Sequence, residues 1–149
     1  MVKRSHQEKI LLGLSGEFAV ASHLCLHGYV ANLTPKNYPG VDILAFNPKN
    51  KRSVAIQVKA KLTELGGEDY FLHEKINDED PPFVFVEFAT KDDVPQFFVV
   101  SAKDVAEISE RERESYIKAH PDVKKEQPRM ISLRTIQEFK DQWQSLGLD

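Results

Sequence analysis

The chain lacks several features on which large classes of protein depend. Its 149 residues contain one cysteine, which excludes an intramolecular disulfide and every zinc cluster built on cysteines, and fits a reducing compartment. Its longest apolar run, Ile10–Leu14, is too short to cross a bilayer, and no internal repeat or low-complexity tract is present. We therefore expect one domain over residues 1–149, cytoplasmic and without a membrane partner.

Hydrophobic residues make up 41% of the chain and charged residues 29%, which is typical of a packed globular protein. The net charge of −3 is unevenly distributed: residues 1–62 hold nine Lys or Arg against three Asp or Glu, and residues 63–149 hold eleven against twenty. The net charges of these two parts are therefore +6 and −9. The first part favours a polyanionic partner, whereas the whole-chain pI near 6.0 is typical of an ordinary solvated surface.

The first part of the chain predicts one helix and three strands. Ser5-His6-Gln7-Glu8 has the form of a capping box and Gly28 that of a C-terminal stop, so we expect a helix between them. Three short β-rich segments follow, and Asn47-Pro48-Lys49-Asn50 is a hairpin turn between the last two. The predicted strands are Tyr29–Leu33, Val41–Phe46 and Ser53–Lys61.

The second part predicts an acidic insert, two strands and two helices. Residues 62–80 carry seven acids against one lysine and should form a loop, with at most a short element over 70–75. The segment Phe83–Phe88 is apolar enough to be a buried central strand. The predicted elements are the strands Phe83–Phe88 and Gln96–Val100, a helix over 102–120 capped by Ser101, and an amphipathic helix Thr135–Leu146 stopped by Gly147. The predicted fold class is mixed α/β, with the C-terminal helices on a mixed sheet.

Polar side chains alternate with apolar ones in two neighbouring strands. Gln57 and Lys59 share one face of their strand, and Ile56 and Val58 share the other. In the preceding strand, the side chains of Asp42 and Ile43 likewise point to different faces. If the strands form a hairpin, then Asp42, Gln57 and Lys59 gather on one surface. A carboxylate, an amide oxygen and an ammonium suit a divalent cation and a phosphate, although an ordinary half-solvated sheet face has the same alternation.

Glu17 lies within the apolar stripe of the first helix. At about 100° per residue, Ile10, Ala21 and Leu24 fall within about 40° of it, so Glu17 should face the sheet. A buried carboxylate is costly unless a cation or a lysine pairs with it. The alternative is a glutamate that reaches solvent between its small neighbours. In the same projection Cys25 falls in the core stripe, and His23 and His27 fall on the solvated side.

These residues together resemble the PD-(D/E)XK nuclease superfamily, which includes restriction endonucleases and Holliday-junction resolvases. The resemblance covers Gly13–Lys61 and rests on Gly16-Glu17, on the segment Tyr38–Phe46 and on Val54–Lys61, in the expected order of one helix and three strands. It implies a restriction-endonuclease-like core. Asp42 matches the motif aspartate, Lys59 its lysine and Glu17 the helix glutamate of resolvase-like members.

The resemblance implies hydrolysis of a phosphodiester, with DNA as the expected partner and Mg²⁺ or Mn²⁺ as the cofactor. Glu17, Asp42, Gln57 and the carbonyl of Val58 would hold the cation, and Lys59 would position water and stabilise charge on the phosphate. Two departures stand out: Gly40-Val41 separates Pro39 from Asp42, and Gln57 replaces a carboxylate. The residues expected to contact phosphates are Lys3, Arg4, Lys9, Lys36, Lys49, Lys51, Arg52 and Lys61.

The main alternative is a non-catalytic module of the same fold, which binds nucleic acid or a protein in a defence or toxin-related system. The small size of the chain, the neutral Gln57 and the acidic second part favour it. A homodimer through the aromatic strands Phe83–Phe88 and Gln96–Val100 is compatible with either function.

Overall fold

The fold is built on a mixed five-stranded sheet, and the computed structural model describes it over residues 3–35, 38–123 and 127–149. Strands β3 and β5 are parallel, and the other neighbouring pairs are antiparallel. The mixed α/β class is therefore confirmed. The strands lie in the order β1 (Val30–Leu33), β2 (Ile43–Phe46), β3 (Ser53–Leu62), β5 (Phe83–Phe88) and β6 (Gln96–Val100).

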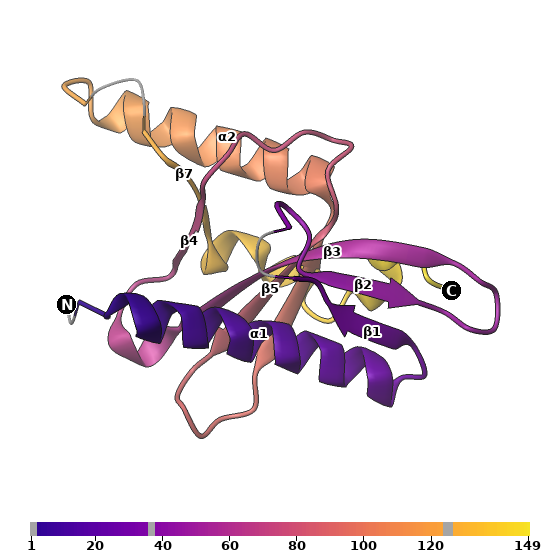
Figure 1. Cartoon of the computed structure of the whole chain (residues 1–149). Coiled ribbons are helices and arrows are strands. Elements are labelled where there is room, and N and C mark those ends of the chain that lie inside the picture. The colour runs from indigo at the N-terminus through magenta and orange to yellow at the C-terminus, as the bar shows by residue number, and fades with distance from the viewer. Residues whose placement is uncertain (1–2, 36–37, 124–126) are drawn as a thin grey trace.

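Helices and a second, small sheet cover the two faces of the main sheet (Figure 1). Helix α1 (His6–Leu26) packs on one face, against Ile43, Ile56 and Val84. On the other face lie α2 (Ala102–Ala119) and the antiparallel pair β4 (Asp69–Leu72) and β7 (Arg129–Ser132), above a second core that includes Phe83, Phe85 and Phe98. Each face of the central strands is thus buried in its own apolar cluster.

The capping signals of the sequence are confirmed. The Ser5 side chain accepts a hydrogen bond from the Glu8 amide, and the Glu8 carboxylate accepts one from the Ser5 amide, which completes the capping box of α1. Gly28 follows the helix with φ of +90°, a conformation that few other residues adopt. Ser101 caps α2 in the same way, through the amide of Asp104.

One expectation about the irregular regions holds in part and another is wrong. The short element expected over 70–75 within the acidic insert is β4, a strand over Asp69–Leu72, which forms because Tyr70 and Leu72 alternate into the second core and β7 pairs with it. The predicted helix Thr135–Leu146 is instead two 3₁₀ helices, η2 (Leu133–Phe139) and η3 (Trp143–Leu146). Between them the chain bonds to the edge of β6, where the Asp141 amide donates to the Phe97 carbonyl.

The predicted dimer interface lies inside the fold. Phe83, Phe85 and Phe98 are fully buried in the second core. The outer edge of β6 is met by the bridge from Phe98 to Lys140. The aromatic side chains of β5 and β6 therefore stabilise the chain itself and are not available to a second copy.

The buried face of α1 is turned relative to the expectation. Gly16, Val20, Ala21 and Leu24 are buried, whereas Cys25, expected in the core, is exposed. His23, expected on the solvated side, is half-buried, with its ring stacked on Trp143 at 4.1 Å between centroids. The C-terminal segment packs beside the helix there, so contacts distant in sequence decide which side of the helix is covered.

One helix among the described residues, α1, has the length and hydropathy that a membrane span requires. This differs from the expectation drawn from run lengths, because glycine and serine interrupt the apolar residues of α1 without adding charge. In the fold, Val20 and Leu24 of α1 are almost fully buried against the sheet.

We predict that Gly16 is required for the approach of α1 to β3. A Cβ at position 16 would lie 2.6 Å from the Cβ of Ala60, on a rigid strand, whereas a Cβ at position 13 would have nothing within 4 Å. Gly16→Val should therefore lower the free energy of unfolding by about 2–3 kcal/mol. The matched variant Gly13→Ala should raise it by up to ~1 kcal/mol through helix propensity. Urea denaturation of both variants measures the difference, and equal effects would contradict the packing.

Candidate active site

The β2–β3 hairpin opens at Asp42. The last residue pair in register is Ile43 with Ile56, and the Asp42 amide still donates to the Ile56 carbonyl at 2.9 Å. Beyond this point β2 no longer bonds to β3, and the Asp42 side chain takes up the next amide of β3. Its Oδ2 accepts a hydrogen bond from the Val58 amide at 2.7 Å. The carboxylate is therefore held at the point where β2 and β3 separate. Its Oδ1 accepts no hydrogen bond from the described residues.

The main chain of Val58 turns toward the same opening. In a strand, the N–H and C=O of one residue point to the same side. The Val58 amide points to Asp42, and the Gln57 amide donates to Pro82 on the opposite side at 2.9 Å. The carbonyl of Val58 must then point into the space beyond the start of β2, next to the Asp42 carboxylate.

The four side chains predicted from the sequence meet at one hollow of about 280 Å³. Asp42 reaches it from the start of β2, Gln57 and Lys59 from β3, and Glu17 from α1. The helix glutamate thus arrives from one side of the sheet and the strand residues from the other, at the open end of the hairpin. The open end of the hairpin is therefore the place where Glu17, Asp42, Gln57 and Lys59 lie close together.

Thr34 is a site residue that the sequence reasoning missed. Its amide donates to the Asp42 carbonyl at 2.9 Å, and its hydroxyl donates to the Val41 carbonyl, so β1 holds the backbone on which the aspartate is mounted. Thr34 also lines the hollow. A threonine at the end of a strand is too common a pattern to have been singled out from the sequence.

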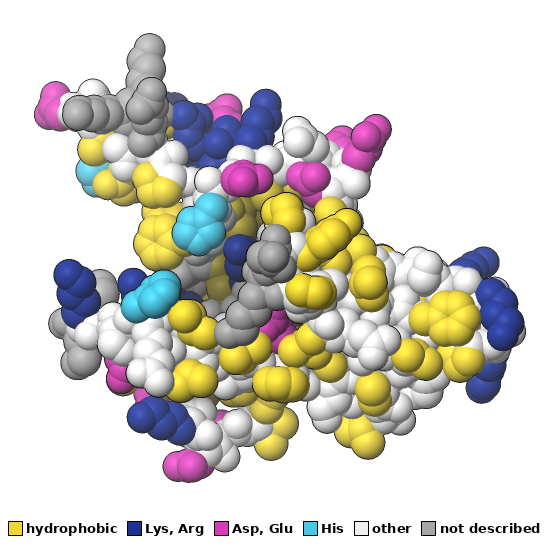
Figure 2. All heavy atoms as spheres, in the orientation of Figure 1, with side chains coloured by type: hydrophobic (Ala, Val, Ile, Leu, Met, Phe, Trp, Pro, Cys, Tyr) yellow, Lys and Arg dark blue, Asp and Glu magenta, His cyan; other side chains and the backbone are white. Residues whose placement is uncertain are grey.

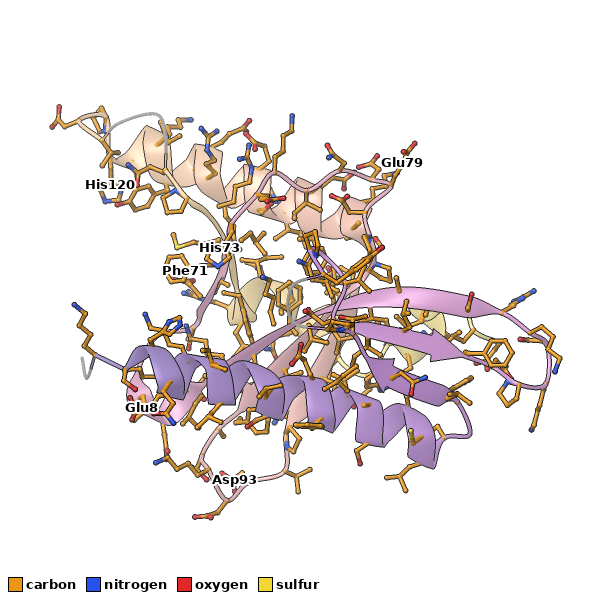
Figure 3. All side chains as sticks on the ribbon, viewed as in Figure 1. Glu8, Phe71, His73, Glu79, Asp93 and His120 are labelled. Atoms are coloured by element: carbon orange, nitrogen blue, oxygen red, sulfur yellow. The ribbon has the colours of Figure 1, made fainter. Side chains whose placement is uncertain are left out.

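Lys59 lies between two hollows. Together with Gln57 it lines the first hollow and also a second one of about 260 Å³, which is bounded by His73 and other residues of the segment 72–81. Figure 3 shows His73 and Phe71 projecting from the region of β4 into the space between α1 and α2. Burial lowers the pKa of Lys59, and the nearby Asp42 carboxylate opposes that shift. The ammonium of Lys59 is therefore costly to bury.

The oxygen donors around the first hollow fit a hard divalent cation. They are two carboxylates, the amide oxygen of Gln57 and the carbonyl of Val58, and oxygen is the donor that Mg²⁺ prefers. Within the described residues no three His, Cys, Asp or Glu side chains cluster as metal ligands do. A cation here would consequently depend on Gln57 and on the main chain for half of its protein ligands.

The basic residues predicted to contact phosphates fall into two groups at opposite ends of the molecule, where Figure 2 shows dark blue side chains. Lys49, Lys51 and Arg52 lie at the turn of the β2–β3 hairpin. Three of the predicted basic residues donate hydrogen bonds to main-chain carbonyls within the fold. Arg4 donates to Leu62, Lys61 to Asp69 and Arg52 to Asp149. Lys36 lies outside the described residues. Lys3, Arg4, Lys9 and Lys61 form the other group, and Lys9 lines the first hollow.

A scan of the chain against models of known protein families found no match, and no curated protein matches its sequence. The likeness to the nuclease superfamily therefore rests on the residues of the hollow and on their order along the chain.

We predict that replacing Lys59 by methionine stabilises the protein. The lowered pKa means that the folded state disfavours the charged amine, so removal of the charge should raise the free energy of unfolding at neutral pH. The gain should shrink as the pH rises toward 10.5, the ordinary lysine pKa, because the wild-type amine then loses its charge in both states. Thermal unfolding at pH 7 and at pH 10 measures it.

Lys61→Met is the matched control. Burial also lowers the pKa of Lys61, but its ammonium donates a hydrogen bond to the Asp69 carbonyl that the variant loses. We expect no gain in stability from it. If Lys59→Met destabilises the protein as much as Lys61→Met does, Lys59 is a structural residue.

Proposed function

We propose that this protein is a metal-dependent phosphodiester hydrolase that acts on DNA. The observation that carries the proposal is the meeting of Glu17, Asp42, Gln57 and Lys59 at one hollow, where the β2–β3 hairpin opens. Carboxylates beside a half-buried ammonium suit the reaction. The carboxylates bind a cation, and the ammonium stabilises the negative charge that develops on the phosphate. The chain would carry this out in the cytoplasm.

The architecture supports the proposed restriction-endonuclease-like core. A long helix precedes a meander of three antiparallel strands, and the chain then crosses to a parallel strand beside β3. The catalytic residues of the proposal lie on the middle and last strands of the meander and on the helix that covers them. The acidic insert and the β4–β7 pair come later in the chain, and residues 72–81 of the insert bound the second hollow beside Gln57 and Lys59.

Each residue has a separate role in the proposed reaction. Glu17, Asp42, Gln57 and the Val58 carbonyl would hold Mg²⁺ or Mn²⁺, which supplies positive charge and a water molecule of lowered pKa. Asp42 keeps its orientation because Oδ2 is bonded to the Val58 amide. Lys59 orients the attacking water and holds the non-bridging phosphate oxygens through charge-assisted hydrogen bonds. Thr34 positions Asp42 through the backbone.

A binding module without catalysis is the second candidate. The specific observation in its favour is the neutral Gln57, together with the absence of a third acidic or histidine ligand among the described residues. Such a module would hold the phosphate backbone with Lys59 and Lys9 at the same hollow and would leave it uncut.

Incubation of the protein with single-stranded, duplex and branched DNA tests the proposal. We expect cleavage with Mg²⁺ or Mn²⁺, and none when a chelator is present. Binding without cleavage of any substrate in either metal would favour the binding module.

We further expect that DNA affinity, measured in Ca²⁺, falls steeply with salt. Few of the basic residues lie at the hollow itself, so about three or four phosphates should be neutralised, and affinity should fall by about 40-fold to 150-fold between 50 and 200 mM salt. Fluorescence anisotropy across that range measures the slope. A flat salt dependence, or no binding at low salt, would contradict nucleic-acid binding in either form.

A further inference from the structure

The outer surface of α1 carries an uncharged stripe that the fold does not cover. Leu11 is 55% exposed and Phe18 60%, and both lie on the side of the helix away from the sheet. Between Ile10 and Leu26 the only charged residue is Glu17, which lines the first hollow instead. Hydrophobic side chains follow α1 in the lower part of Figure 2. The stripe consists of Leu11, Ser15, Phe18, Ser22 and Cys25, all exposed, at intervals of four and three residues.

An apolar hollow of about 350 Å³ adjoins the stripe on one side. Leu12, Leu62, Leu65 and Phe88 form its apolar walls, and Leu11 and Ser15 belong both to the hollow and to the stripe. Three charged residues, Arg4, Glu8 and Lys91, also line it. At the other end of the helix, Leu26 is 83% exposed and projects on the same side of the stripe as the hollow. One molecule therefore presents both an apolar hollow and an apolar side chain that nothing covers.

We propose that α1 pairs with α1 of a second copy of this chain, antiparallel and about a two-fold axis at Phe18. In this register Leu11 faces Cys25 of the second copy, and Ser15 faces Ser22. The large Phe18 then lies at the centre, where the small serines on either side leave room for its ring. Residues spaced by four and three positions in turn lie on one side of a helix, so each turn of α1 contributes one side chain to the contact between the two helices.

The two-fold axis also brings Leu26 of one copy to the hollow of the other. An axis perpendicular to both helices reverses their direction and keeps each flank of the stripe on the same side of the pair. Leu26 then lies level with residues 10 and 11 of the second copy, on the flank where the hollow opens. Because both contacts occur twice, the interface is self-complementary.

Its size predicts a reversible dimer. The stripe and Leu26 expose on the order of 500 Å² of side-chain surface, so the pair buries about 1,000 Å² in total, the lower limit of specific interfaces. The stripe itself holds no charged residue, and the charged residues at the interface are those that line the hollow that receives Leu26, namely Arg4, Glu8 and Lys91. We therefore expect dissociation in the micromolar range.

The pairing has a consequence that rests on the proposed function. The hollow with Lys59 lies on the flank of the stripe opposite to the apolar hollow, and the two-fold axis keeps that flank on one side of the pair. Both hydrolytic sites would then face the same side of the dimer and could act on the two strands of one duplex.

Engineered disulfides with the native Cys25 test the register without using activity. In an antiparallel pair the two Cys25 residues lie about 21 Å apart, so the wild type should not cross-link under mild oxidation. Leu11→Cys should form a covalent dimer through Cys25 of the second copy, and Phe18→Cys combined with Cys25→Ser should cross-link to itself. Leu11→Cys with Cys25→Ser should not. Cross-linking of the wild type, or monomers in all four proteins, would overturn the proposal.

Sedimentation equilibrium of untreated protein gives an independent measurement. Phe18→Glu places two like charges on the axis and should raise the dissociation constant more than ~100-fold. The matched control is Phe71→Glu, because Phe71 is 54% exposed on β4 and does not belong to the stripe, so the constant should stay unchanged. Equal effects of both variants would contradict the interface. So would a wild-type monomer that floats with phospholipid vesicles, since the stripe would then face a membrane.

Discussion

Replacement of Lys59 by alanine should reduce Mg²⁺-dependent cleavage of DNA by about 100-fold to 1,000-fold, which corresponds to ~2–4 kcal/mol of transition-state stabilisation. The ammonium lines the hollow together with Asp42, and burial lowers its pKa. Negative charge on the phosphate is greatest in the transition state, so the loss should fall mainly on the rate. Single-turnover cleavage with enzyme in excess measures it directly.

The affinity for DNA should change far less in the same variant. One lysine among several basic residues contributes about one unit to the salt slope. The matched control is Lys51→Ala, at the turn of the hairpin, which should lower affinity as much as Lys59→Ala and leave the rate constant intact. Metal-dependent cleavage that survives Lys59→Ala unchanged would show that the reaction occurs elsewhere. Absence of cleavage in the wild type, with equal binding losses in the two variants, would favour the binding module.

Replacement of Gln57 by glutamate should tighten the binding of Mn²⁺ about tenfold or more. The substitution adds a formal charge beside Asp42 and Glu17, and affinity for hard cations rises with the number of charged ligands. Without metal the three carboxylates repel one another, so the variant should unfold at a lower temperature than the wild type. Added Mn²⁺ should reverse that loss. Calorimetric titration and thermal unfolding with and without metal measure both effects.

Gln144→Glu is the matched control, since Gln144 is exposed on η3 and outside the hollow. It adds the same charge to the protein and should not change Mn²⁺ affinity. If Gln57→Glu also leaves the affinity unchanged, Gln57 orients neighbouring groups and is not a ligand.

Local signals in the sequence were sufficient for most of the regular elements. The serine caps of α1 and α2 satisfy their own helix ends, and the alternation of β2 and β3 reflects burial on one face of the sheet. These are interactions between residues close in sequence. The hairpin then brings Asp42 opposite Gln57, so the candidate site could be predicted as far as its strand residues.

The remaining features depend on partners distant in sequence. Strand β4 forms because β7, about sixty residues later, pairs with it. The helix expected over 135–146 breaks because the segment bonds to Phe97 at the edge of β6. Trp143 stacks on His23 and so covers a side of α1 that a helical projection assigns to solvent. Periodicity within a segment carries no information about such contacts.

The candidate site also combines features that local sequence predicts with features that depend on contacts distant in sequence. Strand alternation identified Gln57 and Lys59, and the helical projection singled out Glu17 within the apolar stripe of its helix. The support from Thr34 and the direction of the Val58 carbonyl follow only from where β2 stops pairing with β3. The spread of the basic residues over two ends of the molecule was likewise not visible in the charge count of residues 1–62.

Titration of Mn²⁺ into the protein, in parallel with the Asp42→Asn variant, measures whether Asp42 holds a cation at the hollow. If the hollow at the open end of the hairpin is a metal site, the wild type should bind one Mn²⁺ ion per chain. Asp42→Asn should lose that binding, because Oδ1 of Asp42 is the oxygen that its hydrogen bond to Val58 leaves available. A wild type that binds no Mn²⁺, or an Asp42→Asn variant that binds it as tightly as the wild type does, would contradict the account.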